Sequence, residues 1–200
     1  MRHAASAALA AALALSATAL AQAPVEHKGK PGDPAAAPAG SLSSGDKRFI
    51  EKAARDGMAE VALAQLAREQ GLSEPVKSFA SRMDRDHSDA NRDLAALAAA
   101  KGVAIPNDID RKDQKEIDKL RKQLGPDFDR AYMSHMVKDH KKDVDAFRHE
   151  AKHGKDADVR KFAAAKLPTL EEHLRMAQST RDVTLGTKRT GDRETGSSKP

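Results

Sequence analysis

Cysteine and tryptophan are both absent from the 200-residue chain. Without cysteine the protein forms no disulfide, carries no thiol nucleophile and has no cysteine for lipid attachment. Aromatic residues make up 3% of the chain, with a single tyrosine, which leaves little material for a surface that stacks bases. The net charge is +5, but lysine and arginine are interspersed with aspartate and glutamate. We therefore expect a solvated charged surface and no nucleic-acid partner.

A long apolar run occurs only at the N-terminus. Residues 1–21 have the order of an export signal, with Arg2 and His3, an apolar stretch from Ala4 to Leu20, and small residues around a cleavage site after Ala21. We expect cleavage there and a mature protein in the periplasm or outside the cell. Because no second apolar run follows, we expect no membrane-spanning segment in the mature chain.

The two ends of the remaining chain are poor in apolar surface. Residues 22–45 hold Pro24, Pro31, Pro34 and Pro38 among glycine, alanine and serine, and are predicted to be a flexible linker. Residues 185–200 are rich in glycine, threonine, serine and charge, and are predicted to be disordered. One folded domain over residues 46–184 remains.

Apolar residues between these ends recur with helical spacing, and no alternating strand pattern is found. Long helices are predicted over residues 46–70, 73–102, 127–153 and 156–181. The short turns between the first two and between the last two make each pair an antiparallel hairpin. We therefore predict an all-α, antiparallel four-helix bundle, with residues 103–126 as a short helical crossover between two hairpins. Pro168 predicts a kink in the last helix or its division into two helices.

Each long helix carries one metal-capable side chain near its middle: Glu60, His87, His140 and His173. Counted from the expected N-caps, each lies about 20–26 Å into a helix of roughly 40 Å, so the four would meet at one height. Three imidazoles and a carboxylate suit a zinc, iron, manganese or copper ion. The carboxylates expected to orient the imidazoles are Asp84, Asp86, Asp139, Asp143, Glu171 and Glu172. The alternative is a metal-free network of the same groups, which would specify packing or respond to pH.

A second motif, His149-Glu150-Ala151-Lys152-His153, matches the zinc-peptidase pattern His-Glu-x-x-His, with Glu172 as a third ligand. The motif falls in the last turn of a predicted helix, where positive charge is favoured for structural reasons. Lys152 also places a charge between the two histidines. We keep a zinc metallopeptidase as a minor alternative and favour a non-enzymatic protein.

Several short motifs coincide in this chain. They are Gly57-Met58-Ala59-Glu60, Asp86-His87 followed by Leu94, Phe128-Asp129 with Tyr132, Asp139-His140-Lys141-Lys142, and Leu170-Glu171-Glu172-His173-Leu174. Together they resemble an exported bacterial family, the domain of unknown function 4142 (DUF4142). The resemblance covers about residues 46–180 and implies a ferritin-like four-helix bundle behind a signal peptide. It implies no established activity.

The ferritin-like resemblance does not extend to a full di-iron site. Di-iron members of that superfamily use a Glu-x-x-His pair on each of two helices. Here the residues three positions before the histidines are Asp84, Val137 and Leu170. A mononuclear or metal-free site fits better. By analogy we expect an exported metal-binding bundle that serves metal handling or envelope stress, with a non-catalytic structural or interaction module as the alternative. The sequence indicates no particular protein partner or oligomer.

Overall fold

The computed structural model describes residues 42–186. In this range the chain forms five α-helices and no strand: α1 (Ser44–Gln70), α2 (Glu74–Ala100), α3 (Arg111–Arg121), α4 (Gly125–His153) and α5 (Ala157–Thr184). None of these helices combines the length and hydropathy that a membrane-spanning segment requires. The expected signal peptide, and nearly all of the expected linker and tail, lie outside the described residues.

Short polar side chains set where the helices begin. The Ser43 hydroxyl accepts a hydrogen bond from the Asp46 N–H at 3.1 Å, so Ser43 caps α1, and the helix begins at Ser44, before the predicted start at residue 46. The Asp46 carboxylate is buried and instead accepts the backbone N–H groups of Lys155 and Asp156, at 2.8 and 3.0 Å. These bonds attach the start of α1 to the loop before α5. The Asp156 side chain accepts the backbone N–H groups of Asp158 and Val159 and so caps α5.

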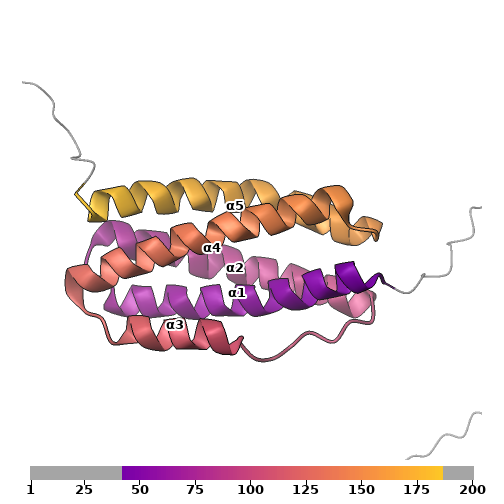
Figure 1. The fold of residues 1–200 in the computed structure, drawn as a ribbon, viewed down its shortest axis with the longest axis horizontal. Coiled ribbons are helices and arrows are strands. Elements are labelled where there is room, and N and C mark those ends of the chain that lie inside the picture. Colours follow the sequence, from indigo (N-terminus) through magenta and orange to yellow (C-terminus); the bar gives the residue numbers. More distant parts are fainter. Residues whose placement is uncertain (1–41, 187–200) are drawn as a thin grey trace, which may run out of the picture. The chain divides into compact units, whose positions relative to one another are not determined.

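The helices form two antiparallel pairs, α1 with α2 and α4 with α5 (Figure 1). Contacts of α2 with α5 and of α1 with α4 close a four-helix bundle, and the short α3 lies against α1 and α4. This is the predicted all-α architecture, with α3 as the helical part of the crossover. α5 runs unbroken through Pro168, so its division into two helices was a wrong expectation.

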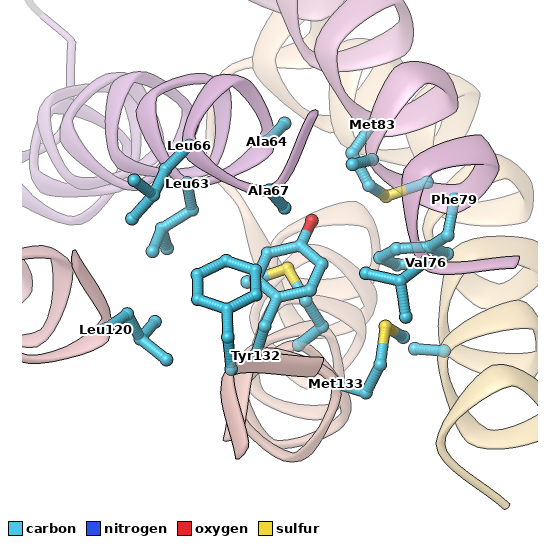
Figure 2. Packing of buried hydrophobic residues seen from close by; sticks show 14 of the residues in the cluster. Leu63, Ala64, Leu66, Ala67, Val76, Phe79, Met83, Leu120, Tyr132 and Met133 are labelled. Atoms are coloured by element: carbon cyan, nitrogen blue, oxygen red, sulfur yellow. The ribbon is translucent and has the colours of Figure 1, made fainter. Parts of the chain in front are cut away.

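The apolar interior is divided into two clusters. One contains Phe79 and Tyr132 and lies where α1 ends and α2 begins (Figure 2). The other contains Ile50 and Leu94 and lies toward the opposite end of the bundle. Each large apolar side chain buried in these clusters contributes about 1.5–3 kcal/mol to folding. Between the clusters the helices bury a layer of polar side chains: Glu60, His87, His140 and His173.

Candidate metal centre

Three histidines from three helices converge in the polar layer. His87 on α2, His140 on α4 and His173 on α5 are 5%, 0% and 1% exposed. One ring nitrogen of each lies within 4.8 Å of the corresponding nitrogens of the other two. This is the one group of three or more metal-capable side chains with such spacing in residues 42–186. The predicted convergence at mid-height is therefore present for all three histidines.

Each imidazole uses its other nitrogen to hydrogen-bond an oxygen. His87 Nδ1 lies 2.7 Å from Glu60 Oε2, and His173 Nε2 lies 2.8 Å from Asp86 Oδ2. His140 Nδ1 lies 3.0 Å from the carbonyl oxygen of Met136. Because a carbonyl accepts and cannot donate, His140 Nδ1 carries the proton in this bond. If the ring nitrogens bonded to Glu60 and Asp86 carry their protons in the same way, all three rings are held in one orientation. Oxygen partners orient metal-bound histidines in this manner.

The remaining nitrogens have no oxygen partner. His87 Nε2 and His140 Nε2 are 3.4 Å apart, and His173 Nδ1 is buried without a hydrogen-bond partner. Two nitrogens that each bind a tetrahedral zinc ion at about 2.0–2.1 Å are separated by roughly 3.3 Å. The spacing of His87 and His140 therefore suits a shared metal ligand set. The orphaned nitrogen of His173 supplies the third member.

Glu60 on α1 lies beside this group as the partner of His87. Its Oε1 atom is buried without a hydrogen-bond partner and lies 3.6 Å from His140 Nε2. One oxygen of Glu60 thus orients an imidazole, and the other faces the centre. The sequence predicted Glu60 as a metal ligand. It did not indicate that one oxygen of Glu60 orients His87.

The charge states follow from burial and from these contacts. Burial raises the pKa of Glu60, but the charges of His87 and His140 and the hydrogen bond from His87 outweigh it and lower that pKa to about 2. Burial lowers the pKa of His87, and Glu60 reverses the shift, so it lies above its usual value. The pKa of His140 is lowered, chiefly by burial, and burial with the charges of its histidine neighbours lowers that of His173 to about 4. The contact between Glu60 and His87 thus favours the charged form of both groups, and burial favours the neutral form of His140 and His173.

Of the six carboxylates expected to orient the imidazoles, Asp86 is the one hydrogen-bonded to a ring of the group. Asp143 is buried near Glu60. The other four form ion pairs elsewhere: Asp84 with Arg68, Asp139 with His135 and Lys142, Glu171 with Arg148, and Glu172 with Arg82. These four residues are near a histidine in sequence, but neighbouring positions on a helix point in different directions, so their side chains do not face the group.

A cavity of about 290 Å³ adjoins the centre, and Glu60, His87 and His173 form part of its wall. Three protein nitrogens would leave at least one coordination position of a bound ion for water or a small ligand, as in catalytic rather than structural metal sites. Asp56 also lines this cavity and was not selected from the sequence. Its position four residues before Glu60 places it on the same face of α1, which was the available signal.

The peptidase motif does not assemble a second centre. His149 and His153 are exposed, with ring centroids 4.9 Å apart in the last turn of α4. Glu150 is buried and shares a hydrogen bond with Asp46, and Glu172 is ion-paired with Arg82. The general base and the third ligand of the metallopeptidase hypothesis are thus both engaged elsewhere.

Fold and site together define the class of protein: an all-α, four-helix bundle with three histidines converging in its core. The chain matches the family model for a domain of unknown function, DUF4142, over residues 31–180, and it belongs to that family. The family membership predicted from the short motifs is thereby confirmed.

Two solved structures have a similar fold. A DUF305 fragment from Deinococcus radiodurans is 14% identical, with a TM-score of 0.64, over 72% of this chain and 99% of that one. A conserved hypothetical protein from Mycobacterium tuberculosis is 20% identical, with a TM-score of 0.54, over 74% of this chain and 96% of that one. At such identities the likeness concerns the fold alone. No protein with a curated description matches the chain.

Proposed function

We propose that this protein binds one transition-metal ion through His87, His140 and His173 and serves metal handling in the cell envelope. The observation that carries the proposal is the arrangement of ring nitrogens. In each histidine one nitrogen is held by an oxygen, and the three rings bring one nitrogen each within 4.8 Å of the others. A metal ion would satisfy the buried lone pairs that such an arrangement leaves.

The donor set favours some metals over others. Neutral imidazoles suit zinc, copper and iron, whereas manganese prefers oxygen ligands. We therefore rank zinc, copper and iron above manganese. A single ion is proposed because the residues three positions before the histidines include no glutamate, whereas di-iron sites in such bundles use Glu-x-x-His pairs.

Export is part of the same proposal. The order of charge, apolar run and small residues in residues 1–21 supports cleavage after Ala21. Mass spectrometry of the protein from a periplasmic fraction should then show a mature chain that begins at Gln22. A full-length chain in the cytoplasmic fraction would contradict export.

Metal analysis tests the binding site. Untagged protein from a periplasmic fraction should contain about one zinc, copper or iron ion per chain. His140→Ala should lose that ion, while the exposed double variant His149→Ala/His153→Ala should retain it. Absence of bound metal, together with no uptake when zinc, copper or iron is added, would contradict the proposal.

One observation favours a metal-free alternative. In the protonated state His87 bridges Glu60 and His140, and His140 bonds to Met136, so a continuous chain of contacts runs across the polar layer. The second candidate is therefore a structural or interaction module in which these histidines specify packing.

A further inference from the structure

Two cavities lie beside the metal centre. The larger, of about 290 Å³, is bordered by His87 and His173. The smaller, of about 170 Å³, is bordered by the exposed residues Lys52 and Lys112. Three acidic residues belong to the walls of both cavities: Asp56, Glu60 and Asp143. An ion that approaches through either cavity therefore meets the same carboxylates.

Asp143 is the member of this set that most needs an explanation. It is 9% exposed and makes no hydrogen bond or ion pair with any residue between 42 and 186. Asp56, by contrast, forms an ion pair with Lys52. Glu60 Oε1 is a fully buried oxygen without a hydrogen-bond partner in the same walls. A buried acceptor that lacks a donor, beside a carboxyl group without a partner in a cavity wall, indicates a place where a ligand is bound.

We propose that Asp143, together with Asp56 and Glu60, forms an entry site through which a divalent transition-metal cation reaches the three histidines. This inference rests on the proposed function. Asp143 lies one helical turn after His140 on α4, and Asp56 lies one turn before Glu60 on α1, so each adjoins a group at the centre. Burial, with the charges of Glu60 and Asp56, raises the pKa of Asp143 well above its usual value, so an incoming cation would take the place of the Asp143 proton. The carboxylate oxygens would replace water around that cation, and the negative charge of the cleft raises the local cation concentration and the rate of association.

The single tyrosine supplies a means of measuring the entry rate. The chain has no tryptophan, and the ring of Tyr132 lies 6.2 Å from that of Phe79, which is 6.3 Å from that of His140. Copper(II) bound at the centre should therefore quench Tyr132 fluorescence. Stopped-flow mixing of the metal-free mature protein with copper(II) then gives the association rate constant. All proteins should carry His149→Ala/His153→Ala, because that exposed pair offers copper a second site.

Asp143→Asn is the test variant and Asp145→Asn is its matched control. Both are on α4 and replace a carboxyl group by an amide, but Asp145 is exposed and ion-paired with Arg148. Asp143→Asn should lower the association rate constant about tenfold or more, because an amide cannot exchange a proton for the incoming cation, and steering by a charged cleft contributes factors of about 10–10³. Asp145→Asn should leave the rate within about twofold of the parent, because surface charges in water are weakly coupled to the centre.

The outcomes separate this inference from the function on which it rests. One copper ion per chain with an unchanged rate in Asp143→Asn overturns the entry site and leaves the metal centre in place. Loss of the bound ion in Asp143→Asn, with helical circular dichroism retained, also overturns it, because Asp143 would then be a ligand. No binding of copper, zinc or iron by the parent protein overturns the proposed function and the entry site together.

Discussion

Asp84 and Asp86 lie on the same helix, but their side chains have different partners. Asp86 accepts the Nε2–H of His173, whereas Asp84 is ion-paired with Arg68. The carboxylate on an imidazole increases the basicity of the ring and keeps its other nitrogen pointed at the metal. At the scale of the residue, the geometry of the centre therefore depends on partners that do not themselves bind the ion.

Asp86→Asn should weaken zinc binding by about 10–100-fold, because a neutral amide replaces the charged acceptor of His173. The matched variant Asp84→Asn removes the same charge from α2 and should leave the affinity within about twofold. Competition with a chromophoric zinc chelator measures both dissociation constants. Equal affinities for the two variants would contradict the positioning role of Asp86.

At the scale of the element, α1 and α2 approach each other closely at Gly57. A Cβ atom at this position would overlap Asn91 Oδ1 and lie 3.0 Å from Asn91 Cγ. Gly57 is buried inside α1, where glycine is less favourable than alanine by about 1 kcal/mol. The close helix pairing explains why a residue with poor helix propensity occupies this position.

Gly57→Ala should destabilise the protein by about 1–2 kcal/mol, because the steric overlap with Asn91 outweighs the gain in helix propensity. In the background Asn91→Ala the same substitution should stabilise it by up to about 1 kcal/mol. Urea unfolding of the four proteins in this double-mutant cycle measures the coupling. Additive effects would show that Asn91 does not restrict Gly57.

The start of α1 and the end of α4 are joined by a pH-dependent contact. Glu150 shares a hydrogen bond with Asp46, and burial, with the bond to Asp46 and its charge, raises the pKa of Glu150 to about 7 from 4.5. Between these two values the folded state retains a proton that the unfolded state loses. This contact should therefore stabilise the fold fully below about pH 4.5 and progressively less as the pH rises to about 7.

Glu150→Gln removes this titration and keeps a hydrogen-bond donor toward Asp46. The variant should equal the parent in thermal stability near pH 5 and exceed it near pH 8. Glu69→Gln, an exposed position on α1, is the control and should follow the parent at both pH values. If Glu150→Gln were less stable than the parent at pH 8, the assignment of the proton would be wrong.

The bundle and the convergence of the histidines could be predicted from the sequence, because helical periodicity and cap positions determine face and height. The partners of the histidines could not. Asp86 precedes His87 in sequence, but its hydrogen bond is to His173 on another helix. Side-chain torsions and the distance between helices decide such pairs, and neither is encoded by local spacing. The same limit applies to Asp139, which lies beside His140 and bonds to His135.

At the scale of the whole molecule, metal binding should stabilise the fold by mass action. Zinc at about 100 times its dissociation constant contributes about 2.7 kcal/mol, which corresponds to roughly 5–10 °C in Tm for a domain of this size. Calorimetric scans with zinc and with chelator measure the difference. The His140→Ala variant should show none.

A different result would favour the metal-free alternative. The pKa values of His140 and His173 are lowered in the folded state, the latter to about 4, so the unfolded state binds more protons between that value and the usual 6.5. Stability should therefore fall as the pH drops through this window. A Tm that follows pH in this way but ignores zinc and chelator would identify a hydrogen-bonded core instead of a metal centre.

The polar layer between the two apolar clusters also constrains helix register. Alanine is frequent on the inner faces of α1 and α5, and such smooth faces allow helices to slide past one another with little change in packing. A slip of one turn would place Glu60, His87 or His173 against aliphatic side chains and leave each without its partner. Buried polar groups select a single alignment in this way in other helical assemblies. The layer thus fixes how far each helix extends along its neighbours, whether or not a metal is bound.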